Sequence, residues 1–327
     1  MIAASDFIRL PYAHDLTEAG IAYALRSLSH TYTRMGGNPY DRLRRVVASA
    51  AVELAFRRYL SEQNIPFDIK SAAPFTDPNR YDVALGGRRC DIQSFFISRR
   101  EQISEMKRNP RIILSAPALV PSERNAAEGY LGSDIYLFAF LSGLVAASRE
   151  DLKKAIGAGQ SHYLIHAMPD AWIRPAQWNP LGTLVLKSEG ERALTLELNG
   201  QDEKRELHSL EAAIPSRGQI EILNEFFSLT HFHAKTPLNS QIGVYCSQRK
   251  ESHFINASDW SNIQVYGMEI LLVGFLTREE FAHKAKPVSE GTRVFQYDKT
   301  RTKNLAVSVS ELKPLAELFA RIKEMKQ

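Results

Sequence analysis

Two carboxylates and a glutamine lie close together in the stretch YDVALGGRRCDIQSFF, in which Gly86-Gly87 separates Asp82 from Asp91 and Gln93. Both glycines can adopt positive φ, so this dipeptide favours a two-residue hairpin turn between two strands. The resulting register pairs Leu85 with Arg88, Ala84 with Arg89, Val83 with Cys90 and Asp82 with Asp91.

Directly opposed residues of an antiparallel pair point to the same side, so the hairpin places the carboxylates of Asp82 and Asp91 side by side. Gln93, two residues further on, joins them on that face. Because like charges repel there, a divalent cation between them is the simplest compensation. Hard oxygen ligands, with Cys90 on the other face, favour Mg²⁺ or Mn²⁺ over zinc. Such an ion can activate water for phosphodiester hydrolysis.

Opposed acids by themselves are a modest signal. The alternatives are a solvent-exposed sheet face, or a pair of carboxylates bridged by Arg89. The same sequence offers a control, because an Asn199-Gly200 turn would place Glu197 opposite Asp202 in a charged, solvated hairpin. If the repulsion between Asp82 and Asp91 dominates, replacing either with Asn leaves the metal-free fold intact or stabilises it.

Basic residues are concentrated around this motif. Between Asp41 and Arg111 there are fourteen basic and nine acidic residues, an excess of five that accounts for the whole net charge of +4. Only two of the fourteen are lysines. Arginine binds phosphate oxygens through paired N–H groups, so the segment favours a polyanionic partner, with a solvated basic surface as the alternative. The candidate nucleic-acid-binding residues are the pairs Arg44/Arg45 and Arg99/Arg100.

The order of these residues resembles the PD-(D/E)xK nuclease superfamily, in particular its archaeal Holliday-junction-resolvase-like and restriction-type endonucleases. A helix with Glu53 in AVELAFRRYL is followed by a strand, then Asp82, then DIQ at Asp91. The resemblance covers about residues 41–141. It implies acidic roles for Glu53, Asp82 and Asp91, with Asp82 and Asp91 as metal ligands.

The motif departs from the family at two positions. Tyr81, not proline, precedes Asp82, and Gln93 stands where the family carries lysine. Some active members also have glutamine there. Glutamine can orient a water but supplies no positive charge. Arg89 or Lys70 is therefore the candidate cation.

Other candidates are weaker. His231 and His233 would share one face of a strand but have no third ligand, so a packed pair is the favoured interpretation. His166 and Asp170 lie in a stretch rich in Trp and Pro that indicates a packed loop. Phosphate-binding GxxxxGK and GxGxxG motifs are absent from the sequence, and two cysteines are too few for a disulfide framework.

The pattern of apolar residues and turn signals predicts an α/β fold. We expect a helical arm over residues 1–40, a restriction-endonuclease-like core over 41–170 with a mixed sheet flanked by helices, and a β-rich α/β domain of unknown role over 179–327. Among the expected elements are a helix over 41–60, a strand over 135–141, a helix over 220–229 and a C-terminal helix over 311–326.

These observations favour a cytoplasmic Mg²⁺-dependent endonuclease that hydrolyses DNA, with double-stranded DNA preferred. By the resemblance, its setting is restriction or another defence against foreign DNA. The chain has neither an apolar run of about 18 residues nor a secretory signal, so no membrane partner is expected. A second copy of the chain is the other partner considered. The alternatives are a non-catalytic nuclease-like module that binds nucleic acid or protein, and an unrelated enzyme with its site in the second half.

Overall fold

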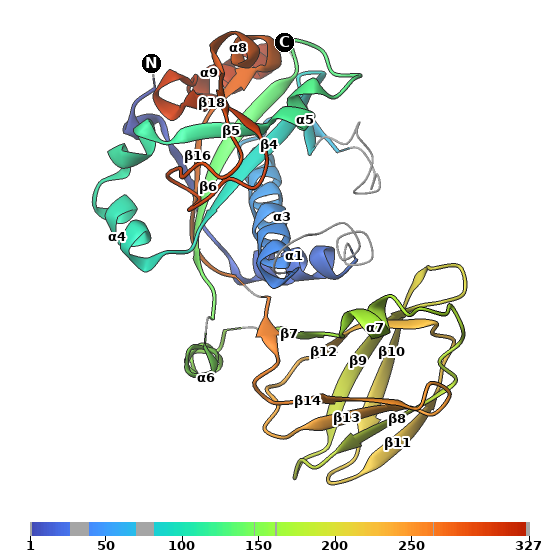
Figure 1. Cartoon of the computed structure of the whole chain (residues 1–327). Coiled ribbons are helices and arrows are strands. Elements are labelled where there is room, and N and C mark those ends of the chain that lie inside the picture. The colour runs from blue at the N-terminus through green and yellow to red at the C-terminus, as the bar shows by residue number, and fades with distance from the viewer. Residues whose placement is uncertain are drawn as a thin grey trace. The chain divides into compact units, whose positions relative to one another are not determined.

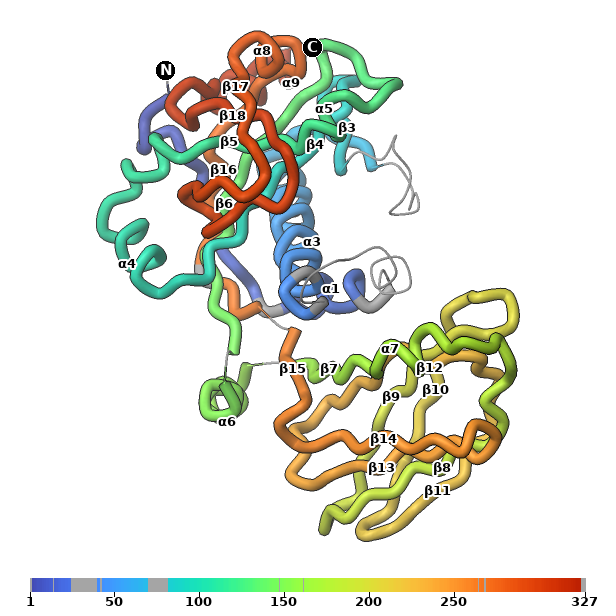
Figure 2. The backbone as a smooth tube through the Cα atoms, viewed as in Figure 1, coloured from blue at the N-terminus to red at the C-terminus, as the bar shows by residue number. Residues whose placement is uncertain are grey.

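The computed structural model describes residues 2–26, 39–69, 82–146, 148–160, 162–263 and 265–324. The chain forms two compact units (Figures 1 and 2). The first comprises Met1–His30, Arg44–Leu144 and Val265–Gln327, and the second comprises Thr31–Leu43 and Val145–Gln264.

This division differs from the consecutive segments 1–40, 41–170 and 179–327 expected from the sequence. The reason is that strand β16 (Tyr266–Thr277) returns to pair with strand β6 (Ile135–Leu144), with Tyr266 opposite Leu144. The longer segment of the second unit, Val145–Gln264, therefore lies in sequence between two neighbouring strands of the first.

A mixed six-stranded sheet forms the centre of the first unit. Its order is β1 (Ile8–Leu10), β16, β6, β4 (Arg88–Ile97), β3 (Val83–Leu85) and β2 (Phe67–Asp68). Only the pair β4–β6 is parallel. The helices are α1 (His14–Arg26), α3 (Pro39–Glu62), α4 (Arg100–Arg108), α5 (Ser122–Ala126), α8 (Arg278–Lys284) and α9 (Leu315–Glu324), with 3-10 turns at Ala4–Asp6, Pro110–Ser115 and Val309–Glu311. The unit is a mixed α/β structure.

Three of the four predicted pairs of the β3–β4 hairpin are confirmed. Val83 lies opposite Cys90, Ala84 opposite Arg89 and Leu85 opposite Arg88. Gly86 and Gly87 have φ values of 55° and 73°, the left-handed conformation that a tight turn requires. The regular pairing ends at Val83 and Cys90, so the expected pair of Asp82 with Asp91 is not part of the ladder. The N–H of Asp82 instead donates to the carbonyl of Cys90 (3.2 Å).

Alternating residues of β4 face two different layers. The Ser94 hydroxyl donates to that of Ser49 on α3 (3.1 Å), so helix α3 covers the face that also carries the buried Cys90 (Figure 1). Asp91, Gln93 and Phe95 project to the opposite face. There Phe95 packs in a core with residues of β6, and a three-stranded sheet contributes to the same core. That sheet consists of β17 (Lys286–Val288), β18 (Asn304–Ser308) and β5 (Pro117–Pro121).

The second unit is a sandwich of two antiparallel sheets (Figure 1). The five-stranded sheet contains β10 (Leu207–Ile214), β9 (Leu194–Gln201), β12 (Ser228–Ala234), β7 (Leu164–Ala167) and β15 (Ser261–Asn262). The four-stranded sheet contains β11 (Gln219–Leu223), β8 (Thr183–Ser188), β13 (Ile242–Cys246) and β14 (Glu251–Ile255). Apolar residues of both sheets share one core, and two short helices accompany them, α6 (Arg149–Gly157) and α7 (Asp170–Ile173).

Two expectations for this unit are wrong. Asn199 and Gly200 lie within strand β9, and the connection to β10 is made at residues 202–206, so Glu197 lies opposite Glu211 rather than Asp202. A Cβ at Gly200 would clash with the carbonyl oxygen of Ser228 on the neighbouring strand, so this glycine serves a close approach and not a turn. Residues 220–229 contain parts of β11 and β12 instead of a helix.

Candidate functional site

Asp82 is positioned by the first residues of the β3–β4 hairpin. Its Oδ2 accepts a hydrogen bond from the N–H of Ile92 (2.7 Å), and its carbonyl oxygen accepts one from Arg57 of α3 (2.9 Å). Burial raises the pKa of the Cys90 thiol well above its ordinary value, and the negative charges of Asp82 and Asp91 raise it further. Both acids of the predicted pair therefore lie beside this thiol.

Asp91 is a buried carboxylate with 6% of its surface exposed. Arg124 of α5 binds it with both ends of its guanidinium group, from Nε to Oδ2 (2.9 Å) and from Nη2 to Oδ1 (3.3 Å). Burial acts to lower the pKa of Arg124, but the attraction and hydrogen bonding of Asp91 outweigh it and raise the pKa. A fixed cation therefore stands at the carboxylate for which the sequence predicts a metal.

Glu53 is the acid that the family resemblance adds from the first core helix. Its carboxylate pairs with Arg57 four residues later on α3, the spacing at which a helix favours an ion pair, and both side chains are largely buried. Arg57 also donates to the carbonyl of Asp82, so Glu53 is linked to the hairpin through Arg57. Helix α3 covers the face of β4 opposite to Asp91. Glu53 thus lies on the opposite side of strand β4 from Asp91.

Gln93 lies half-buried on the face of Asp91, in register with Phe138 of the parallel strand β6. Arg89 lies on the same face, but its Nη1 donates to the carbonyl of Gly129 (2.8 Å). Its guanidinium carbon is 5.6 Å from the centroid of the Tyr130 ring. The interactions described for Arg89 thus attach it to the loop after α5. Lys70 and Tyr81 lie outside the described residues.

The basic pairs have different surroundings. Arg99 is attached to the loop before β18, because it donates to the carboxylate of Asp298 (2.7 Å) and to the carbonyl of Phe295 (3.2 Å). The guanidinium carbon of Arg45 lies 5.5 Å from the centroid of the Tyr297 ring. Arg44 is half-buried and Arg100 is exposed. Among these four residues, Arg100 has the most accessible position for a phosphate contact.

Sequence reasoning missed Arg124, which binds Asp91, together with Tyr130, Asp134 and Arg278, which contact Arg89 or Arg124. The buried Asp134 accepts the N–H groups of Arg89 (3.1 Å) and Leu131 (2.8 Å), which fixes the loop before β6. Arg278 begins helix α8 and donates to the carbonyl of Asn125. These residues are 33 to 187 positions from Asp91 in the chain, so no local spacing could have identified them.

Two histidine pairs occupy the second unit. His231 and His233 are buried on β12 with ring centroids 4.8 Å apart, and burial lowers the pKa of His233 to about 4. The Nε2 atoms of His166 and His253 are 3.0 Å apart, and burial lowers the pKa of both rings. Neutral rings fit both settings. Asp170 begins the short helix α7.

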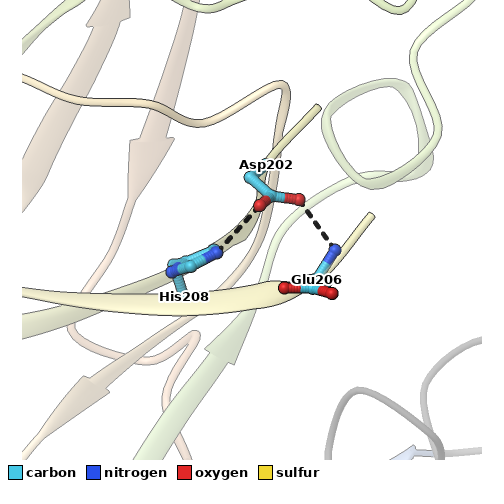
Figure 3. A group of neighbouring side chains, drawn as sticks. All are labelled: Asp202, Glu206 and His208. Carbon is cyan, nitrogen blue, oxygen red and sulfur yellow. Dashed lines mark hydrogen bonds and ion pairs between the residues drawn. The ribbon is translucent and has the colours of Figure 1, made fainter. Parts of the chain in front are cut away.

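Within the described residues, one group of three His, Cys, Asp or Glu side chains has its ligand atoms close enough to share a metal ion: Asp202, Glu206 and His208. Figure 3 shows how this group closes the β9–β10 connection, with His208 on one oxygen of Asp202 (3.0 Å) and the N–H of Glu206 on the other (2.8 Å). Glu206 and His208 are exposed. The cluster therefore has a sufficient local explanation as a turn.

Comparisons with known proteins assign no family. The chain matches no protein-family model and no curated protein. A solved structure described as "CC2D1B coordinates ESRCT-III activity during the mitotic reformation of the nuclear envelope" is 7% identical, over 51% of this chain and 72% of that chain, with a TM-score of 0.10. A likeness this low carries no argument about fold or function. No helix in the described part of the chain is long and apolar enough to cross a membrane.

Proposed function

We propose that the first unit is a Mg²⁺- or Mn²⁺-dependent endonuclease with its centre at Asp82 and Asp91. The observation that carries this proposal is the β3–β4 hairpin: Asp82 precedes its paired residues and accepts a hydrogen bond from Ile92, the residue after Asp91, and Gln93 follows on the same strand. The order of elements supports a restriction-endonuclease-like fold: α3 is followed by the antiparallel strands β2, β3 and β4, and then by β6 parallel to β4.

The donor set fits a magnesium ion in part. Mg²⁺ commonly takes one or two carboxylates and completes its shell with waters and substrate phosphates, and two carboxylates without a neighbouring imidazole match that preference. Glu53 is a supporting acid in this proposal, because it acts on the site through Arg57, which donates to the carbonyl of Asp82. A bound ion would polarise a phosphoryl oxygen and lower the pKa of a coordinated water.

The chain's own residues would divide the remaining work. Asp82 and Asp91 would hold the ion, and the Gln93 amide would orient a water. The carboxylate of Asp91 already binds Arg124, so an arriving ion must share that carboxylate or displace the guanidinium group. Arg124 then supplies positive charge next to the reacting phosphate, the contribution that glutamine at position 93 lacks. Arg89, which donates to the carbonyl of Gly129 in the loop after α5, would be a second cation near the phosphate.

Cleavage of supercoiled plasmid and of single-stranded DNA, with Mg²⁺, Mn²⁺ or EDTA, tests the proposal. We expect cleavage that requires the divalent ion and is abolished by Asp91→Asn and by Asp82→Asn. Asp202→Asn is the matched control, because it removes a carboxylate from the cluster at the β9–β10 connection and should leave cleavage unchanged. A parent protein that cleaves neither substrate with either ion would contradict the proposal.

One observation favours a second function, a non-catalytic nuclease-like module that binds nucleic acid or protein. The bidentate Arg124–Asp91 pair satisfies both oxygens of the candidate ligand without a metal. A magnesium titration of the melting temperature separates the two functions. A nuclease centre should be stabilised by about 1.4 kcal/mol at ten times its dissociation constant, whereas a non-catalytic module should show no specific effect.

A further inference from the structure

Three arginines from separate elements converge on Tyr130. The guanidinium carbons of Arg89 (β4), Arg124 (α5) and Arg278 (α8) lie 5.6, 5.7 and 4.2 Å from the centroid of its ring. All three distances are within the range of cation–π attraction. We call these four residues the arginine cluster.

The cluster is held in place by the surrounding backbone. Arg278 donates to the carbonyl oxygens of Arg124 (3.4 Å) and Asn125, and Arg89 donates to that of Gly129 (2.8 Å). Arg124 is oriented by its two bonds to Asp91. The three guanidinium groups are therefore arranged before any ligand arrives, which lowers the entropy lost on binding.

One donor of the arginine cluster is buried and lacks an acceptor among the described residues. Burial raises the pKa of Tyr130, the arginines of the cluster lower it and Asp91 raises it. Arg278 is 8% exposed, and its buried Nη1 has no hydrogen-bond partner within the described residues. A buried charged donor without an acceptor is costly. An anion bound at the cluster would supply an acceptor for such a donor.

A purely structural role explains part of the cluster. Stacking on Tyr130 and Tyr136 stabilises Arg278, and its bonds to backbone carbonyls fix the loop after α5. That role does not require Arg89 and Arg124 to reach the same ring. Tyr130 is half-buried and 28% of the Arg124 side chain is exposed, so a ligand can reach these groups from solvent.

We propose that Arg89, Arg124, Arg278 and Tyr130 form a binding site for a phosphate group next to Asp91. Guanidinium groups bind phosphate through paired N–H donors, and the Tyr130 hydroxyl adds a further donor. That the phosphate belongs to a DNA phosphodiester rests on the proposed nuclease function. The anion site itself rests on the cluster alone.

Calorimetric titration of the full chain in EDTA tests the site without a metal. The ligands are inorganic phosphate and a short oligothymidylate, each in a chloride background of constant ionic strength. The parent should bind both. Arg89→Gln and Arg124→Gln should each weaken binding about 10- to 100-fold, as expected for loss of a charged hydrogen bond. Arg249→Gln removes another half-buried arginine that donates to a backbone carbonyl and should leave binding unchanged.

A parent that binds neither ligand would overturn the site, as would unchanged affinity in both cluster variants. Melting temperatures without phosphate identify any variant that has lost its fold. Arg89→Lys is a milder change, because it keeps the positive charge at position 89. Binding of phosphate alone would assign the site to free phosphate rather than to DNA. Lost binding in the variants together with an inactive parent would contradict only the nuclease. Cleavage with phosphate affinity unaltered in the variants would contradict only this site.

Discussion

Replacing Asp91 with Asn should destabilise the metal-free protein, because the change leaves Arg124 without its carboxylate. Removal of one partner from a buried ion pair costs about 3–5 kcal/mol. The Arg124 side chain is 28% exposed, so water compensates it in part, and we expect about 2 kcal/mol. At about 2–4 °C per kcal/mol for a unit of this size, the melting temperature should fall by about 4–8 °C.

Asp82→Asn is the internal comparison. Oδ2 of Asp82 accepts one hydrogen bond from the N–H of Ile92, and the carbonyl oxygen of an asparagine can accept the same bond. We expect a loss below about 1 kcal/mol. Thermal melts of both variants in EDTA measure the difference directly. A double-mutant cycle with Arg124→Gln isolates the energy of the Asp91–Arg124 pair from other effects of each substitution.

The opposite result is well defined. If repulsion between the two carboxylates dominates, as the sequence alone suggests, Asp91→Asn melts at or above the parent temperature and the cycle shows no coupling with Arg124. Either outcome would refute the claim that the ion pair with Arg124 stabilises Asp91.

Three further predictions concern single positions. Gln93→Lys should retain or raise Mg²⁺-dependent cleavage, because lysine adds positive charge on the face of Asp91; a silent variant beside a silent parent contradicts this. The melting temperature should fall between pH 6.5 and 4, because burial lowers the pKa of His233 to about 4 while the unfolded ring titrates near 6.5, so the unfolded chain takes up protons that the folded chain does not. His233→Gln should flatten this acid-side decline, and an unchanged slope would show that other groups cause it. Gly200→Ala should cost about 1–3 kcal/mol, since its Cβ would meet the Phe226 ring at 2.7 Å, whereas Gly157→Ala, with nothing within 4 Å, should be neutral in the same urea titration.

The sequence predicted what short-range geometry determines. Gly86-Gly87 determined the turn, and the turn determined the register from Leu85–Arg88 to Val83–Cys90. A long apolar run likewise indicated the strand at Ile135–Leu144. The expected helix over 41–60 corresponds to α3, and the expected C-terminal helix corresponds to α9.

The failures have tertiary causes. Asn199-Gly200 has the composition of a turn, but the pair lies inside β9, where Gly200 admits a neighbouring carbonyl. Arg124 had no local signal at all. The chain supplies it from α5, after the strand and helix that follow Asp91, so the ion pair with Asp91 exists only in three dimensions. The pairing of β16 with β6 is likewise a contact between distant parts of the sequence, so no local pattern predicted it.

That return affects how the protein can be made. Strand β6 is buried along nine of its ten residues, and its neighbour on one side is β16, which the ribosome produces only after the whole second unit. Until then the nascent chain carries an apolar strand with one row of unpaired N–H and C=O groups, the form of edge that recruits other chains. The nascent chain is therefore most prone to aggregate while the sandwich is being synthesised. Slower translation of residues 145–264 should lower the yield of soluble protein more than slower translation of the last fifty residues.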